Sequence, residues 1–364
     1  MSKIIELIRQ LESIHPDLYR NYDKDKFYEE ALKIECVDSP ETKVKIARLL
    51  SKLNDGHTSI LFDKKTIVEL RYINGYVYII DDYKNTKSNY LYKKIISING
   101  VKIEEIIKKV RECFPKETEN YSNFVLEQNL LSIELLQGLG VVKDNIIIGL
   151  DDGTNIDYNE ELKKEYIKDI VYFENKIISD DVYYIKYSAC NNMGDMDLSK
   201  WFGLVIDDIK RSNCTKIIVD LRGNTGGNSK YFSKFYEKIK DQGYLFTCLI
   251  DRGVFSSGVF AFNDMINLGS YIIGEQIGTT QNHFGYVTMI NFMGYDITCS
   301  NSEYLLKDGR YIRYKKDEVI PSEIKERVQF EIDDEITENI DDYINGNDEY
   351  INRALKFLMG VKRK

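Results

Sequence analysis

Two short loops in the C-terminal half of the chain carry residues that could do chemistry. The first, residues 222–228 (RGNTGGN), follows an apolar run and contains the adjacent residues Gly226 and Gly227. Glycine pairs let backbone N–H groups approach a ligand closely, so a phosphate or a developing oxyanion could bind there. The Gly-Lys-Ser/Thr of a phosphate loop and the spacing GxGxxG are both absent. A tight turn that only packs the following helix is an equal alternative.

The second loop, residues 254–259, places Ser256 and Ser257 at a sharp turn between an expected strand and an expected helix. A serine held in such a turn exposes its hydroxyl, and the next backbone N–H faces the same space. The arrangement suits a nucleophile and a donor to an oxyanion. The alternative is that one of the two hydroxyls caps the helix that begins near residue 258.

A serine hydroxyl needs a base to become a good nucleophile, and the chain has only three histidines. His57 follows a helix in the glycine turn 55–58 (DGHT), where side chains tend to be exposed. His15 precedes a proline in the N-terminal helical region and is interpreted as structural. His283, on the loop after the last expected strand, is a reserve base. A non-catalytic role is the alternative for each of the three.

The elements that must position these residues fall into three predicted regions. Residues 1–67 are expected to be helical, and residues 68–168 to form an intermediate α+β segment that ends in the polar linker 153–168. Residues 169–364 are expected to form an α/β core, because short apolar runs alternate there with helical patterns. The run 216–221 (KIIVDL) is typical of a strand buried on both faces of a parallel sheet. Sites in such sheets lie where loops leave the carboxyl ends of the strands.

The intermediate segment is predicted in more detail from its apolar periodicity and its turn residues. Strands are expected at 76–80, 94–98 and 146–150, and helices at 103–113 and 123–139.

Composition limits the classes of function. The 364 residues are 43% hydrophobic and 30% charged, with a net charge of −9. These values indicate a globular chain and argue against a nucleic-acid binder, which needs a basic surface. No stretch approaches the roughly 20 apolar residues of a membrane span, and the N-terminus lacks the apolar segment of a secretory signal. The six cysteines form no CxxC pair, so a zinc ribbon or a disulfide scaffold is not expected. We therefore expect a reduced cytoplasmic protein without membrane or nucleic-acid partners.

Taken in order along the chain, these segments resemble the carboxyl-terminal processing protease and tricorn-core family of serine peptidases. The resemblance implies a ClpP/crotonase-like α/β core with a mainly parallel sheet, preceded by a helical N-terminal region and a small β-containing segment. It is carried by HP at 15–16, DGHT at 55–58, KIISINGVKIEEI at 94–106, IIVDLRGNTGG at 217–227, DRGVFSSGVFAF at 251–262, IIGEQIG at 272–278 and GNDEYINRALKFL at 346–358.

The resemblance assigns roles to the two loops. Ser256 falls on the family's nucleophile, Ser257 supplies one oxyanion-hole N–H, and the turn at Gly226 and Gly227 supplies the other. Processing proteases proper use a lysine base in a Gly-Lys-Gly stretch, but residues 278–281 read GTTQ here. The serine–lysine version is therefore excluded by the resemblance.

The histidine-using, tricorn-like branch is the better match. His57 falls on the position of its base, although Gly56 stands where that branch has a serine. The acids nearest to the position of the family's orienting glutamate are Asp317 and Glu318.

The activity implied by the resemblance is that of a serine peptidase. It would cleave extended peptides or unstructured protein tails through an acyl-enzyme, with no metal or organic cofactor. Two alternatives are a catalytically inactive relative that binds peptides or apolar ligands, and a crotonase-like acyl-CoA enzyme, in which the serine turn would have no purpose. The natural substrate and the oligomeric state are not determined by the sequence.

Overall fold

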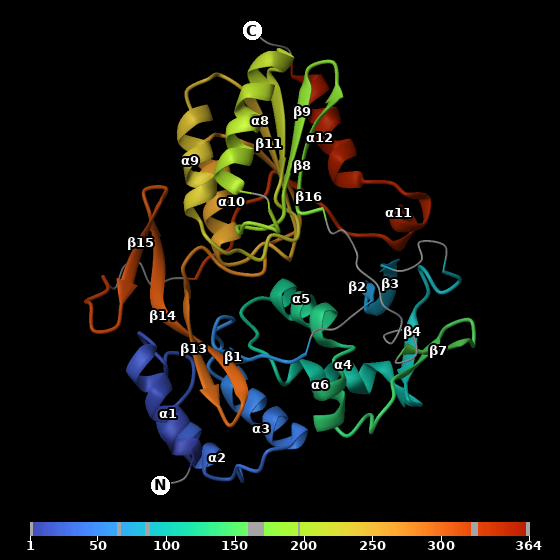
Figure 1. Ribbon diagram of the computed structural model, residues 1–364, viewed down its shortest axis with the longest axis vertical. Helices are drawn as coiled ribbons and strands as arrows, with labels where there is room; N and C mark the ends of the chain where they lie inside the picture. The colour runs from blue at the N-terminus through green and yellow to red at the C-terminus, as the bar shows by residue number, and fades with distance from the viewer. Residues whose placement is uncertain are drawn as a thin grey trace.

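The computed structural model describes residues 3–63, 67–83, 88–158, 171–195, 197–321 and 327–361. Its helices and strands form two bodies (Figure 1). An N-terminal body contains the start of the chain, and an α/β core lies against it and contains the end of the chain. The candidate site residues come from both bodies, so their arrangement depends on how each body is built.

The α/β core is built on a six-stranded sheet. In the order of the sheet its strands are β16 (Asp334–Glu335), β12 (Tyr271–Gly274), β11 (Leu245–Ile250), β10 (Lys216–Asp220), β9 (Val182–Tyr187) and β8 (Phe173–Ser179). The strands from β16 to β9 are parallel, and the edge strand β8 is antiparallel to β9. The prediction of an α/β core with a mainly parallel sheet is confirmed.

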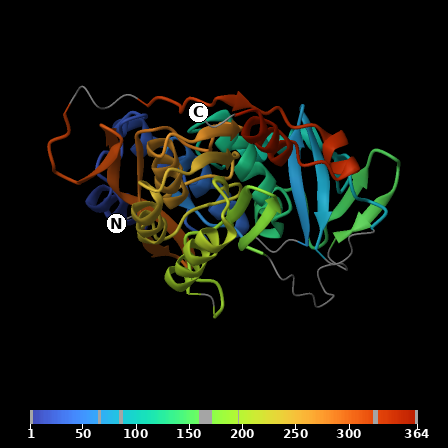
Figure 2. The ribbon, with the colours of Figure 1, turned by 90° about the horizontal axis from the view of Figure 1, so that it is seen from above.

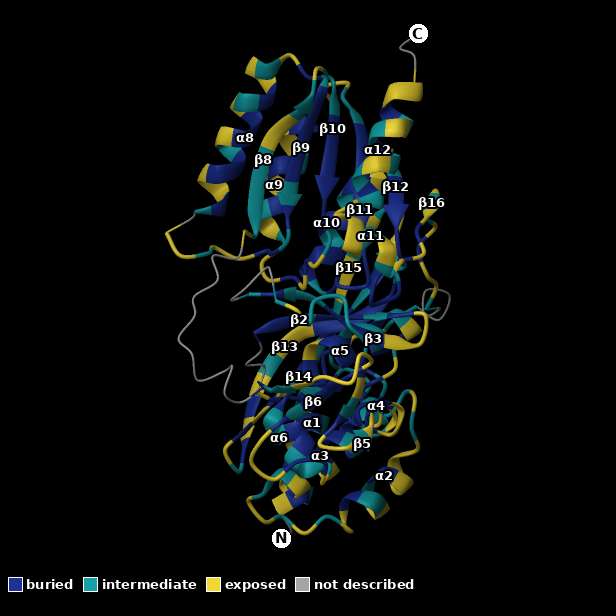
Figure 3. Cartoon of the chain, turned by 90° about the vertical axis from the view of Figure 1, so that its right-hand side faces the viewer, coloured by how far each residue is buried: buried dark blue, intermediate teal, exposed yellow. Residues whose placement is uncertain are grey.

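Helices cover both faces of this sheet (Figures 1 and 3). The helices are α8 (Leu198–Ser212), α9 (Lys230–Ile239) and α10 (Ser257–Asn267) on one face and α12 (Glu349–Gly360) on the other. The short helix α11 (Ile340–Asn345) precedes α12 and buries none of its residues. On β10, Ile217 and Val219 pack into the apolar cluster of α8, α9 and α10, whereas Ile218 packs into the cluster of α12. Because successive side chains of a strand point to opposite faces, covering both faces requires consecutive apolar residues, as at 217–219.

The N-terminal body combines helices from the start of the chain with strands from its second half. The helices are α1 (Lys3–Ile14), α2 (Lys24–Ala31) and α3 (Pro40–Ser51), and the strands are β1 (Ser59–Ile60), β13 (His283–Phe292), β14 (Tyr295–Lys307) and β15 (Arg310–Lys315). The strand order is β1-β14-β13, and β15 pairs with β14. Ile290 and Ile297 lie in one apolar cluster with Leu7 of α1. Segments from both sides of residue 168 therefore share a core.

The intermediate part of the chain shares the apolar core of the N-terminal body and belongs to it, and its described residues form two small sheets and three helices. Figure 2 shows the small sheets at one side of the molecule, away from β13 and β14. The strands are β2 (Val68–Ile73), β3 (Tyr76–Asp82), β4 (Ile95–Ile98), β5 (Val101–Lys102), β6 (Ile147–Leu150) and β7 (Asn155–Asp157), and the helices are α4 (Ile103–Arg111), α5 (Glu119–Asn129) and α6 (Ile133–Gly138).

Three expectations about elements need correction or restriction. The single helix predicted over 123–139 is wrong, because Ser132 ends the helical run by capping α6 through the backbone N–H of Leu135. His283 begins strand β13 rather than lying on a loop. The predicted linker 153–168 lies outside the described residues from 159 onward, and its described part contains β7. No helix within the described ranges is long and apolar enough to cross a bilayer.

Candidate active site

Ser256 lies in the turn between β11 and α10, at the carboxyl edge of the parallel sheet. Its backbone has φ 52° and ψ −124°, a conformation that residues with a side chain adopt only under strain. Ser256 is the N-cap residue of α10, yet its side chain makes no capping hydrogen bond. The Ser257 hydroxyl donates to the carbonyl of Gly227 at 2.6 Å. The helix-cap alternative is therefore not supported for the Ser256 hydroxyl.

The glycine loop lies directly against this turn. Gly226 has φ +104°, and a Cβ atom added to it would lie 2.7 Å from both the Ser256 Cβ atom and the Ser257 nitrogen. This close approach requires glycine at position 226. The N–H of Gly226 donates to the Asn224 side chain at 3.0 Å, so it is already engaged. Within the described part of the chain, the N–H groups of Gly227 and Ser257 donate no hydrogen bond. These two donors are available to a ligand.

His57 is held in the DGHT turn by a buried carboxylate. One oxygen of Asp55 accepts the backbone N–H of His57 at 2.9 Å, and the other accepts the hydroxyl of Thr58 at 2.5 Å and His15 Nε2 at 3.1 Å. The Nδ1 atom of His15 accepts the N–H of Asp17 at 3.0 Å, which places the proton of a neutral His15 on Nε2. His15 thus supports the turn, in agreement with its structural interpretation.

The imidazole of His57 is buried, with only 7% of the residue exposed. The expectation that the turn exposes this side chain is wrong, because the ring stacks on Phe255 at 4.3 Å between centroids and 20° between planes. Among the described residues, both ring nitrogens are buried and lack a hydrogen-bond partner. A hydrogen bond between His57 and Ser256 is therefore not formed in this structure. Burying a polar atom without a hydrogen-bond partner lowers the stability of a fold. The two unpartnered nitrogens of His57 therefore indicate a role other than stability.

One cavity brings the predicted residues together. It has a volume of about 340 Å³, and His57, Gly227, Ser256 and Ser257 all line it. His283 lines the same cavity, and its ring centroid is 6.4 Å from that of His57. Residues that are almost two hundred positions apart in the chain therefore share one space, in which a substrate carbonyl could meet a hydroxyl, an imidazole and two N–H donors.

Burial sets the electrostatics of both imidazoles. It lowers the pKa of His57, and the Asp55 carboxylate opposes this effect only in part. Burial, followed by the neighbouring His57, lowers the pKa of His283 to about 3. Both rings are neutral at pH 7, so either could accept a proton. His283 Nδ1 lies 3.3 Å from the carbonyl of Gln281, an interaction that His57 lacks.

The two acids suggested by the family resemblance lie elsewhere. Asp317 and Glu318 are exposed residues of the turn after β15, and neither lines the cavity. Glu318 accepts the backbone N–H of Lys315 at 2.7 Å within that turn. The structure does not bring either carboxylate to the His57 imidazole. Within the described ranges, no group of three or more His, Cys, Asp and Glu side chains could hold a metal ion.

Sequence reasoning missed the residues that surround Gly56. Its N–H donates to Glu117 at 2.8 Å, and its carbonyl accepts the hydroxyl of Tyr121 at 2.9 Å. A Cβ atom on Gly56 would lie 2.8 Å from Tyr121 Cζ and 2.9 Å from Phe255 Cζ. The aromatic packing thus leaves no room for the serine that the tricorn-like branch has here. No short motif marks Glu117 or Tyr121, because both reach Gly56 only when α5 and the segment before it pack against the turn.

One known protein family matches the part of the chain that contains the glycine loop. The model of peptidase family S41 matches residues 181–248, which run from β9 to β11 and contain the glycine loop. No curated protein matches the chain in sequence. The match covers less than half of the chain and ends before Ser256, so it includes Gly226 and Gly227 but not the candidate nucleophile or base.

Solved structures extend the likeness to the fold of the whole chain. Mature CPAF is similar with a TM-score of 0.68 and 11% identity, and the alignment covers 98% of this chain and 97% of that one. Mature CPAF complexed with lactacystin gives a TM-score of 0.69 at 11% identity, with 98% of each chain covered. The photosystem II D1 C-terminal processing protease gives 0.51 at 12% identity, with 92% of each chain covered. At such identities the likeness shows the fold, and together with the S41 match it supports a peptidase function.

Proposed function

We propose that this protein is a serine peptidase in which Ser256 is the nucleophile and His57 the general base. One observation carries the proposal: a serine in a strained turn, with no capping bond, shares a cavity with a neutral imidazole and the N–H groups of Gly227 and Ser257. Nucleophile, base and oxyanion donors are the three parts that acyl transfer needs.

The mechanism follows from these positions. His57 takes the proton of the Ser256 hydroxyl as the oxygen attacks a peptide carbonyl. The N–H groups of Gly227 and Ser257 stabilise the resulting oxyanion, each worth on the order of 10²–10³ in rate. Gly226 sets the close approach of the two loops, since its own N–H is engaged by Asn224. His57 then protonates the leaving amine, and water hydrolyses the acyl-enzyme on Ser256.

The unpartnered imidazole fits a resting state of this mechanism. Catalytic hydrogen bonds are often long before a substrate binds and tighten in the complex. The ring plane of His57 is set by its stacking on Phe255, and Ser256 lines the same cavity as this ring. The low pKa of the buried ring keeps it in the basic form at neutral pH.

The proposed substrates are extended peptides or unstructured protein tails. Strand β13 pairs only with β14 among the described strands, so its other edge is open. His283, Gly285, Tyr286 and Val287 of this strand line the cavity. An extended chain could add to such an edge through main-chain hydrogen bonds, which would present its carbonyl groups to Ser256.

The test uses the purified chain, a mixed peptide library and a fluorophosphonate probe. Ser256→Ala should abolish both cleavage and labelling, and His57→Ala should reduce them by several orders of magnitude. Ser233→Ala on α9 is the matched control, because Ser233 does not line this cavity. Full cleavage by Ser256→Ala or His57→Ala would remove that residue from the mechanism. If the unmodified chain is not labelled but binds peptides, it is the inactive binding relative instead.

A further inference from the structure

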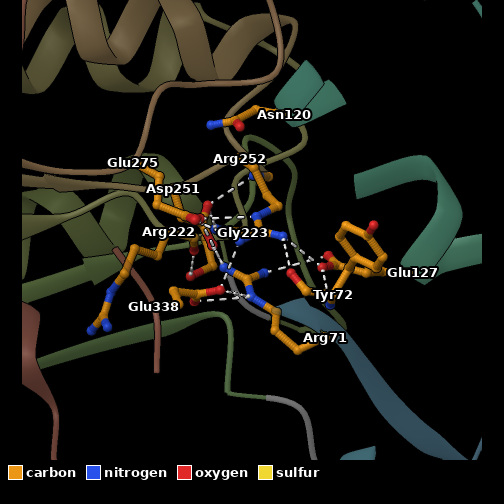
Figure 4. Close-up of polar contacts among 12 residues, drawn as sticks. Arg71, Tyr72, Asn120, Glu127, Arg222, Gly223, Asp251, Arg252, Glu275 and Glu338 are labelled. Atoms are coloured by element: carbon orange, nitrogen blue, oxygen red, sulfur yellow. Dashed lines mark hydrogen bonds and ion pairs between the residues drawn. The ribbon is translucent and has the colours of Figure 1, made fainter. Parts of the chain in front are cut away.

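A cluster of charged side chains is buried where the N-terminal body meets the α/β core (Figure 4). Every member is at most 8% exposed. Two guanidinium groups face four carboxylates in it, and the members are Arg71, Glu127, Asp251, Arg252, Glu275 and Glu338. We call this set the junction cluster.

Arg252 stands at the centre of the junction cluster, four positions before Ser256. Its Nη1 atom donates to Glu127 of α5 and to the carbonyl of Tyr72 of β2, each at 2.9 Å. Its Nε and Nη2 atoms donate to Glu275, which follows β12, at 2.9 and 2.5 Å, and Nη2 also donates to Glu338 at 2.8 Å. All five N–H groups of a guanidinium can be satisfied by these five bonds. Arg252 thus ties its loop to both bodies.

The neighbours of Arg252 extend this connection to the rest of the site. One oxygen of Asp251 accepts the N–H groups of Gly223 and Gly253 at 2.8 and 2.9 Å, which joins the glycine loop to the serine loop. At the other end of the serine loop, the ring of Phe255 stacks on His57 at 4.3 Å and on Tyr121 at 5.0 Å. The segment 251–255 is therefore fixed at both ends against the body that carries His57.

We propose that Arg252 is a positioning residue that sets the Ser256 hydroxyl relative to the His57 imidazole. The inference rests on the proposed function. Ser256 is carried by the core and His57 by the N-terminal body, so an anchor between the bodies controls their separation. A misplacement of about 1 Å can cost on the order of 10²-fold in rate. Lysine has one ammonium group and cannot reproduce five divergent bonds, so it should not replace Arg252.

The charges of the junction cluster shape the choice of variants. Its carboxylates outnumber its guanidinium groups, and burial raises the pKa of Glu127 to about 7. Removing the charge of Arg252 would leave buried carboxylates without their partner, and a variant such as Arg252→Met can then fail to fold. Arg252→Lys keeps the charge and loses the geometry. Glu275→Gln keeps the shape of a partner of Arg252 and removes its charge.

The experiment measures the alignment of Ser256 directly. The second-order rate of Ser256 labelling by a fluorophosphonate probe is determined together with kcat, KM and the urea midpoint of unfolding. Arg252→Lys and Glu275→Gln should each lower the labelling rate and kcat at least tenfold, with KM changed less than threefold. The control Lys43→Met breaks the partly buried pair of Lys43 with Glu134 in the N-terminal body. It should lower the urea midpoint and leave labelling unchanged.

The outcomes separate this inference from the proposed function. Unchanged labelling and kcat in both folded variants, Arg252→Lys and Glu275→Gln, would overturn the positioning role, and so would equal losses in Lys43→Met. If Ser256→Ala still reacts with the probe, the proposed nucleophile fails, whatever the behaviour of the Arg252 variant.

Discussion

Replacing Ser256 by glycine should stabilise the folded protein while removing its proposed nucleophile. The backbone of Ser256 has φ 52° and ψ −124°, a conformation that only glycine adopts without strain. Such a residue stores about 1–3 kcal/mol of strain. Glycine relieves this strain but loses about 0.5–1 kcal/mol through the greater freedom of the unfolded chain. Ser256→Ala keeps the strain, so Ser256→Gly should be more stable than Ser256→Ala by about 1 kcal/mol, and by at most about 2.5 kcal/mol.

The assay is urea unfolding of the two Ser256 variants, followed by tryptophan fluorescence and by circular dichroism. Ser257→Gly provides a control one residue away with the opposite expected sign. Ser257 is the first residue of α10, and its hydroxyl donates to Gly227 at 2.6 Å, so glycine there loses a hydrogen bond and helix propensity. If Ser256→Gly is no more stable than Ser256→Ala, the turn is not strained in solution. The proposal that a strained turn presents the Ser256 hydroxyl as a nucleophile then loses its basis.

Two further predictions concern the base and its turn. Burial lowers the pKa of His57 below its usual 6.5, so the neutral base persists on acidification and the acid-side midpoint of kcat/KM should lie below pH 6.5. A midpoint above pH 6.5 in the pH profile would contradict the assignment. Gly56→Ser should lower kcat at least tenfold and destabilise the fold by about 1–3 kcal/mol, because its Cβ atom would lie 2.8 Å from Tyr121 and 2.9 Å from Phe255. Peptide cleavage and urea unfolding of Gly56→Ser test this prediction. Unchanged values for both would show that the rings of Tyr121 and Phe255 can move aside for the added side chain.

The parallel sheet could be predicted from sequence because its signal is local. The run at 216–221 is apolar at nearly every interior position, as two covered faces require, and the glycine loop follows it directly. Once the strands are parallel, their carboxyl ends meet at one edge, so the loops that contain Gly227 and Ser256 must be neighbours. The contact of Gly226 with the Ser256 turn in the structure is a consequence of this rule.

The sheet formed by β13, β14 and β15 was not predicted for two reasons. Apolar and polar residues do not alternate cleanly along its strands, and its place beside α1 depends on long-range contacts. One usable signal was overlooked. Asp308 and Gly309 have φ 51° and 72° and form the tight turn between β14 and β15, which is the Asp-Gly pattern of a hairpin. The burial of His57 had no local signal. It depends on Phe255, which is distant in the sequence and stacks on the imidazole.

Phe255 also bears on how the proposed site would work without the serine that precedes the histidine in the tricorn-like branch. A serine at position 56 could orient the site by hydrogen bonding, but Phe255 and Tyr121 fill the space that it would need. The ring of Phe255 instead fixes the plane of the His57 imidazole by stacking. Phe255 is bonded covalently to Ser256, so the same residue that orients the base also precedes the nucleophile. A shift of the serine loop would therefore disturb the proposed base as well, and the bonds of Arg252 to Tyr72 and Glu127 oppose such a shift at the start of that loop.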